Sequence, residues 1–172
     1  TVDGFQSRLS IWQVAGMIRS VAQQAGASHE GTCNAPISVV ENPMIIKEIQ
    51  SKTILSNSKI YPYVINPYTG CQHACSYCYA RFMKKFTGHR EAWGEFVDVK
   101  VNAAELLKRE ITKKKRERVW VSGVCDPYQP LEGKYRLTRQ CLEILAENDW
   151  AVVVQTRSPL VLRDMDILTK GK

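Results

Sequence analysis

The chain has 172 residues, of which 44% are hydrophobic and 24% charged, a balance typical of one folded domain rather than a disordered or fibrous protein. A domain of this length buries enough surface to fold without disulfides, so its six cysteines need another explanation. The formal net charge is +7, and no stretch is long and apolar enough to predict a membrane span. The sequence contains no recognisable export signal, so we expect a cytoplasmic protein whose cysteines stay reduced.

Residues 1–35 differ in pattern from the rest of the chain. One amphipathic stretch over 11–25 leads into a segment rich in glycine, serine and histidine, and we interpret residues 1–35 as an extension or linker. From residue 36 onward, short β-branched runs alternate with helical patterns. We therefore place the main domain over 36–172.

Three apolar runs predict strands at residues 59–65, 117–124 and 151–156. Helical patterns follow them and predict helices over 80–86, 103–111, 138–148 and 160–168. Asn102 and Glu105 have the spacing of a capping box, and Thr138 is placed to cap the third helix. Strands without alternation, each followed by a helix, are typical of a parallel sheet. We expect an α/β fold of three strand–helix units, with functional residues at the C-terminal ends of the strands.

Most of the positive charge falls in one segment. Residues 81–118 contain twelve Lys or Arg against six Asp or Glu, and so carry six of the seven excess charges. Two basic runs stand out within it, RFMKKF at 81–86 and KKKRER at 113–118. The second run has two interpretations. It is either a solvated helix C-terminus, where cations offset the helix dipole, or a contact to nucleic-acid phosphates.

The most informative stretch is NPYTGCQHACSYCYAR, which places Cys71, Cys75 and Cys78 within eight residues. Three thiolates on one tight loop can each bind a different iron of a 4Fe-4S cluster and leave one iron open for a ligand. Gly70 suits a backbone that must turn closely at this point. The alternative is a zinc site made of Cys75, Cys78 and two distant residues, although structural zinc prefers paired cysteine motifs.

The C-x3-C-x2-C pattern, with Tyr77 before the last cysteine, resembles the signature of the radical S-adenosylmethionine (radical SAM) enzymes. Residues 42–168, which include CDPYQPLE and LVLRDMDIL, resemble the spore photoproduct lyase-like, DNA repair photolyase-like branch of that superfamily. The resemblance implies a partial (β/α) barrel, of which this chain supplies about the first three strand–helix units. Because the family core has six such units, the resemblance also implies a truncated chain, or one that needs a partner half.

The resemblance further implies cofactors and a reaction. Cys71, Cys75 and Cys78 would bind a 4Fe-4S cluster, and Tyr77 would lie against the adenine of S-adenosylmethionine. An external one-electron reductant of the flavodoxin or ferredoxin type would drive cleavage of S-adenosylmethionine to a 5′-deoxyadenosyl radical, which takes a hydrogen atom from the substrate. The basic segment points to a nucleic acid as that substrate.

Other site residues follow from the same resemblance. Ser122 and Gly123 match the segment that contacts the methionine amino group, and Arg157 falls where a cation could face the methionine carboxylate. Cys125 lies close to the place of a hydrogen-atom donor in spore photoproduct lyase, the alternative being a half-buried loop thiol. Cys141 faces the core. The rival to an enzyme is a zinc-stabilised module that binds nucleic acid without catalysis.

Overall fold

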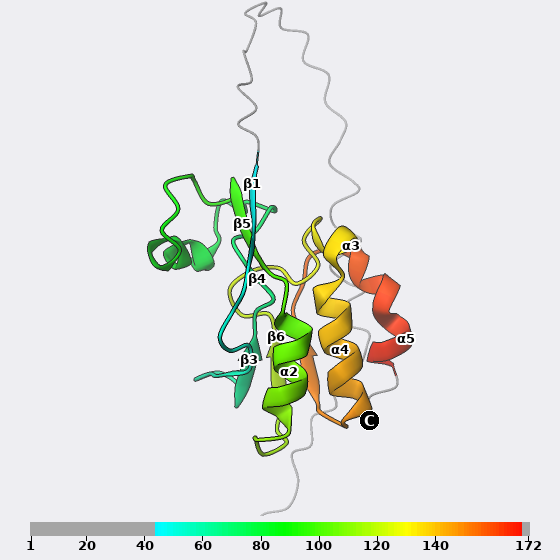
Figure 1. Ribbon diagram of the computed structural model, residues 1–172. Coiled ribbons are helices and arrows are strands. Elements are labelled where there is room, and N and C mark those ends of the chain that lie inside the picture. The colour runs from blue at the N-terminus through cyan, green and yellow to red at the C-terminus, as the bar shows by residue number, and fades with distance from the viewer. Residues whose placement is uncertain (1–43, 170–172) are drawn as a thin grey trace, which may run out of the picture. The chain divides into compact units, whose positions relative to one another are not determined.

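A computed structural model describes residues 44–169, which form a mixed α/β fold with two mixed sheets (Figure 1). The predicted extension over 1–35 lies outside these residues. Within the described part of the chain both sheets are open, and neither closes into a barrel. No helix in the same part is long and apolar enough to cross a lipid bilayer.

The sheet that contains the predicted strands has the order β2-β3-β6-β7. Its strands are β2 (Ser56–Asn57), β3 (Tyr63–Ile65), β6 (Val119–Val121) and β7 (Val152–Val154). The three predicted strands are confirmed as β3, β6 and β7, which are parallel neighbours although shorter than the apolar runs. Strand β2 is antiparallel to β3, and β7 forms an edge of the sheet with its three valines half-buried.

A second sheet, in the order β1-β5-β4, escaped prediction. Strand β1 (Ile45–Ile49) runs parallel to β5 (Phe96–Lys100), whereas β4 (Tyr68–Thr69) is antiparallel to β5. Asp98 interrupts the apolar pattern of β5 and is nonetheless buried, because its carboxylate is hydrogen-bonded to His89. A strand with a buried charged residue does not have the continuous apolar pattern by which buried strands are predicted, because the partner of the charge lies elsewhere in the chain.

The predicted helices are confirmed in position, but the first is a 3-10 helix throughout, the last begins as a 3-10 helix, and α3 was not predicted. The helical elements are η1 (Tyr79–Phe86), α2 (Ala103–Ile111), α3 (Glu132–Tyr135), α4 (Leu137–Glu147), η2 (Pro159–Asp164) and α5 (Met165–Leu168). Helices α2 and α4 lie side by side over the four-stranded sheet (Figure 1). Their apolar faces meet the sheet in one core, in which Cys141 is fully buried as expected.

Both predicted helix caps are wrong, because the polar side chains bind distant loops. The Asn102 side chain accepts a hydrogen bond from the N–H of Ser51 and donates one to the carbonyl of Ser51, each at 2.9 Å. Thr138 lies inside α4, where its hydroxyl donates to the carbonyl of Pro127 at 2.7 Å. These contacts tie the loop after β1 to α2, and the loop after β6 to α4.

The parallel strands place two parts of the basic segment at opposite ends of the sheet. Residues 70–78, which we call the cysteine loop, and η1 follow the carboxyl ends of β3 and β4. The run 113–118 instead precedes the amino end of β6 (Figure 1). The carbonyl of Arg118 accepts a hydrogen bond from the N–H of Tyr63, at the start of β3. The charge that forms one segment in the sequence is therefore divided in space.

Candidate functional site

Asn66, directly after β3, joins the first strand end to the second. Its side-chain oxygen accepts hydrogen bonds from the Ser122 hydroxyl at 2.7 Å, the Gly123 N–H at 2.9 Å and the Val124 N–H at 3.2 Å. The turn after β6 is thereby fixed against the end of β3. Asn66 directly follows the predicted strand over 59–65 and precedes Pro67, and this position was the signal that the sequence offered.

We expect Asn66→Ala to lower the free energy of unfolding by about 2–4 kcal/mol, because the N–H groups of Gly123 and Val124 lose their acceptor and each unsatisfied donor costs about 1–3 kcal/mol. Urea unfolding monitored by tryptophan fluorescence measures the loss. Asn148→Ala is the matched control, since the Asn148 amide is exposed and makes one local bond to the Ile144 carbonyl. An equal loss in both variants would contradict the role of Asn66.

Asp126 joins the second strand end to the third. One carboxylate oxygen accepts from the Thr156 hydroxyl at 2.6 Å and from the Tyr128 N–H at 2.8 Å, and the other accepts from the Arg157 N–H at 3.0 Å. His73 of the cysteine loop also approaches this carboxylate, with Nε2 3.5 Å from its second oxygen. Asp126 thus lies where all three loops meet.

A pair of glutamines braces the cysteine loop. The fully buried Gln129 accepts from the Gln72 N–H at 3.0 Å and donates to the Gly70 carbonyl at 3.3 Å. In return, the Gln72 side chain accepts from the Leu131 N–H at 2.6 Å. The stretch after β6 therefore holds both sides of the loop's first turn.

The backbone of the cysteine loop is tightly packed. Gly70 has φ +92°, and a Cβ there would lie 2.3 Å from the Phe96 carbonyl oxygen, so the predicted need for glycine is confirmed. Ala74, in the middle of the loop, has φ +48°, and a Cβ on Gly94 would lie 2.4 Å from its methyl group. No larger side chain fits at Gly70 or Gly94 without displacing this loop.

The three cysteines of the loop differ in exposure. Cys71 is 5% exposed, and burial raises the pKa of its thiol, whereas Cys75 and Cys78 are half-buried. Cys71 packs with Trp93 and Phe96, and Cys78 borders the same cluster. Among residues 44–169, no three His, Cys, Asp or Glu side chains converge on a point where they could hold one metal ion.

Arg157 brings the third strand end to the cysteines. Its guanidinium donates to Cys75 Sγ and to the Tyr77 hydroxyl, both at 2.7 Å, and lies 5.7 Å from the centre of the Tyr77 ring. The hydrogen bond and charge of Cys75, together with Tyr77, raise the pKa of Arg157. The Tyr77 side chain is 77% exposed, so these predicted site residues meet at the surface.

Ser122, Gly123 and Cys125 form a second group beside the loop. The Ser122 hydroxyl lies 3.1 Å from Cys125 Sγ, which also donates to the Tyr68 carbonyl at 3.4 Å, and the Tyr79 hydroxyl donates to the Gly123 carbonyl. Burial raises the pKa of the Cys125 thiol to about 12. Cys125 therefore carries its proton at neutral pH.

All eight predicted site residues thus lie at one end of a mixed α/β protein, on the loops that follow β4, β6 and β7. No protein-family model matches the chain, and no solved structure matches it. The chain is 42% identical over 127 residues to Uncharacterized protein MJ0683 of Methanocaldococcus jannaschii, which covers 73% of this chain and 47% of that protein.

Two further relatives extend the comparison. Uncharacterized protein Rv2578c of Mycobacterium tuberculosis is 29% identical over 166 residues, which make up 92% of this chain and 45% of the relative. Uncharacterized protein ORF301 of Acidianus two-tailed virus is 33% identical over 118 residues, or 64% of this chain and 38% of the relative. The chain spans about half the length of the first relatives it matches, and none of the names states an activity.

Proposed function

We propose that this chain carries the iron–sulfur site of a radical SAM enzyme, on the first three strand–helix units of a partial (β/α) barrel, and that the enzyme acts on a nucleic acid. The observation that carries the proposal is the meeting of three loops at the carboxyl ends of parallel strands. Asp126 and Gln129 hold the cysteine loop to the loops after β6 and β7. Active sites of α/β folds gather at this end of the strands.

The donor set fits an iron–sulfur cluster better than a single zinc ion. Cys71, Cys75 and Cys78 come from one short loop, and a cluster takes each thiolate at a different iron, so the sulfurs need not converge on one point. A structural zinc ion needs four ligands around one centre. When bound, a 4Fe-4S cluster with one open iron supplies the electron that splits S-adenosylmethionine reductively.

The residues beside the loop can bind and orient S-adenosylmethionine. Arg157 uses one nitrogen for both Cys75 and Tyr77, and its other N–H groups remain available for a carboxylate. The exposed ring of Tyr77 offers a flat surface for an adenine. Ser122 donates its proton to Asn66 and lies 3.1 Å from Cys125 Sγ, and its oxygen has a second lone pair that could accept from an amino group.

Cys125 is proposed as the hydrogen-atom donor of this site. A neutral S–H bond carries a hydrogen atom, which a thiolate does not, and the high pKa of Cys125 keeps the thiol protonated. Cys125 borders the same apolar cluster as Cys71 and Cys78. We further propose that the electron comes from a cytoplasmic flavodoxin- or ferredoxin-type protein.

Reductive cleavage of S-adenosylmethionine tests the proposal. The anaerobically reconstituted chain, mixed with dithionite and S-adenosylmethionine, should form 5′-deoxyadenosine and methionine, measured by mass spectrometry. Arg157→Ala should raise the concentration of S-adenosylmethionine needed for half-maximal product, without loss of bound iron. If protein that retains iron and sulfide forms no 5′-deoxyadenosine, this half of the barrel binds a cluster without turnover on its own. The same negative result after the second half of the barrel is supplied would contradict the enzymatic role. A chain that binds zinc and nucleic acid but no iron would favour the non-catalytic module instead.

A further inference from the structure

The helical element η1 exposes aromatic side chains next to the cysteine loop. Phe82 is 46% exposed and Phe86 is 70% exposed, and their rings meet edge to face with centres 6.4 Å apart. The neighbouring Tyr79 is also exposed, but its hydroxyl has a protein partner. The two phenylalanines have no polar atom, so their exposure to water is unfavourable unless a ligand covers them.

Three cations lie on the same helical element as these rings. The Arg81 guanidinium donates to the Cys75 carbonyl at 3.1 Å, and Lys84 Nζ donates to the Arg90 carbonyl at 2.9 Å. Lys85 Nζ lies 5.8 Å from the centre of the Phe86 ring. Within residues 44–169, no carboxylate forms an ion pair with Arg81, Lys84 or Lys85, so protein charges do not neutralise them.

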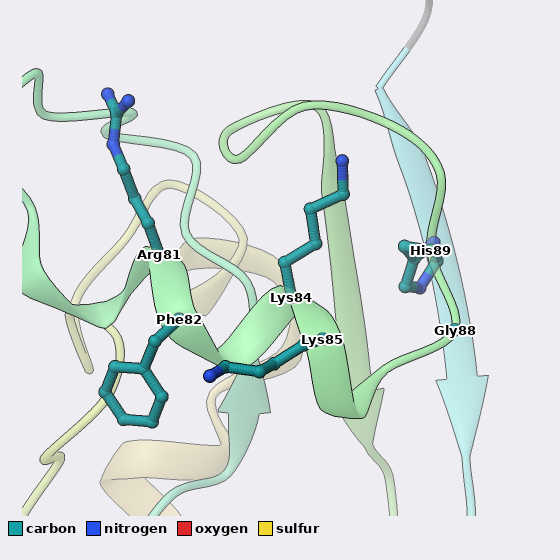
Figure 2. Close-up of a pocket in the computed structure, with 6 residues that line it drawn as sticks. All are labelled: Arg81, Phe82, Lys84, Lys85, Gly88 and His89. Carbon is teal, nitrogen blue, oxygen red and sulfur yellow. The ribbon is translucent and has the colours of Figure 1, made fainter.

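These side chains border an open hollow of about 460 Å³, lined by Arg81, Phe82, Lys84, Lys85, Gly88 and His89. Figure 2 shows Phe82 and Lys85 on one side of η1, with Arg81 and Lys84 on the other, so that Lys85 shares the side of the Phe82 ring and the other two cations project from the opposite side. We call Arg81, Phe82, Lys84, Lys85 and Phe86 the η1 surface.

His89 fixes the far wall of the hollow. Its ring nitrogens lie 3.0 Å from carboxylate oxygens of Glu91 and Asp98, and its ring stacks on Phe96 with centres 4.1 Å apart. Although burial lowers it, the hydrogen bonds to Asp98 and Glu91 raise the pKa of His89 above its ordinary value. Because both nitrogens are occupied, His89 holds the loop to β5 and leaves ligand binding to the η1 surface.

The other basic run lacks these properties. In the stretch 113–118, Lys115 pairs with Glu117 at 3.0 Å and Arg116 pairs with Asp149 at 3.7 Å. The run itself contains no aromatic residue, and the Tyr63 ring, whose centre lies 5.0 Å from Lys114 Nζ, is half-buried. It also lies at the amino end of the sheet, away from the cysteines (Figure 1). Charge alone does not separate the two runs, but ion pairing and aromatic exposure do.

We propose that the η1 surface binds single-stranded nucleic acid, with phosphates at Arg81, Lys84 and Lys85 and unpaired bases stacked on Phe82 and Phe86. Flat aromatic rings among cations are the means by which proteins bind single strands, because every base has a face that can stack. Bases inside a duplex are stacked on each other and do not offer that face. The exposed rings therefore favour a single strand over a duplex.

A protein partner explains the surface less well. Aromatic residues and arginine are enriched in protein interfaces, but lysine is depleted there, and two of the three cations are lysines. The inference rests on the proposed function in one respect: the bound single strand would be the substrate of the enzyme, held beside the cysteine loop. Binding itself is measured without S-adenosylmethionine or a reductant, so it fails or succeeds separately from the enzymatic proposal.

Fluorescence anisotropy of the full chain with a labelled single strand of about 12 nucleotides tests the inference. The double variant K84Q/K85Q should bind at least about tenfold more weakly, and the slope of log K against log salt should fall by about 1.4, which corresponds to two lost phosphate contacts. The matched control K113Q/K114Q should leave both quantities nearly unchanged. Lys85 and Lys113 are exposed and Lys84 and Lys114 are half-buried, so each variant changes one exposed and one half-buried lysine. Circular dichroism should show that both variants stay folded.

Phe86→Leu separates stacking from charge. We expect at least about fivefold weaker binding with the salt slope unchanged, because the base loses its aromatic partner while the phosphate contacts remain. Equal losses in the two lysine variants, or equal affinity for a duplex of the same sequence, would overturn the inference. Binding of an acidic electron-carrier protein at the η1 surface, with no affinity for the strand, would overturn it as well.

Discussion

Replacing Arg163 with methionine is expected to lower the free energy of unfolding by about 3–5 kcal/mol, because the change removes the cation that pairs with the buried Glu132 and leaves Asp164 with Arg139 alone. Arg163 Nη2 donates to Glu132 at 2.8 Å, and its Nε and Nη2 donate to Asp164 at 2.8 and 2.9 Å. Both carboxylates are fully buried. Urea unfolding of the purified chain measures the loss.

Two further variants make the result interpretable. Arg109→Met removes an exposed pair with Glu105 at 3.8 Å and should cost less than about 1 kcal/mol. Arg163→Lys keeps the charge but not the planar guanidinium, and its loss of unfolding free energy should lie between those of the other two variants. It also keeps the test usable if Arg163→Met does not fold. A loss from Arg163→Met no greater than that from Arg109→Met would show that the buried pair is not stabilising.

The ion pair matters for the site because Glu132 connects two parts of the fold. Its carboxylate accepts from the Tyr68 hydroxyl at 2.5 Å and from the Thr138 N–H at 3.0 Å. Tyr68 lies on β4, three residues before the first cysteine of the loop. A disturbed Glu132 would therefore loosen the base of the cysteine loop as well as the packing of α4.

Replacing any one of Cys71, Cys75 and Cys78 with alanine is expected to abolish stable iron binding. A cluster held by three thiolates loses a third of its protein ligands, and the remaining two leave a second iron exposed. Iron content and visible absorption after anaerobic reconstitution measure the effect. Cys141→Ala is the matched control, because Cys141 is fully buried in the apolar core and should leave the iron content unchanged.

The cysteine variants also distinguish a cluster bound by all three thiolates from a zinc site that uses only Cys75 and Cys78. If Cys71→Ala keeps its metal while Cys75→Ala and Cys78→Ala lose it, the zinc alternative is favoured over the cluster. Full iron binding in all three loop variants would contradict a role for the loop in holding the metal.

The order of apolar and polar residues predicted those strands and helices whose burial follows a regular pattern along the chain. The continuous apolar runs around Val119–Val121 and Val152–Val154 predicted β6 and β7, and the apolar stripe over 103–111 predicted α2. Strand β5 escaped prediction because the partner of Asp98 is a histidine in the preceding loop. The Asn102 cap failed because its amide binds Ser51, which lies far away in the sequence.

The site was partly predictable for a topological reason. Parallel strands bring their carboxyl ends together, so residues after three separate strands were expected to meet, and Cys75 and Arg157 do. The sequence did not identify Asn66, Asp126 and Gln129, whose side chains connect the loops. The residues around a polar loop side chain do not indicate which distant residue it will bind. The sequence also suggested that the two basic runs form one charged segment. In the structure they lie at opposite ends of the four-stranded sheet.

The measurement that tests the central claim most directly is the iron and acid-labile sulfide content of the chain after anaerobic reconstitution. An iron–sulfur site on the cysteine loop predicts a brown protein with about four iron and four sulfide per chain, and bleaching when oxygen is admitted. A colourless protein that takes up zinc and retains neither iron nor sulfide would contradict the claim.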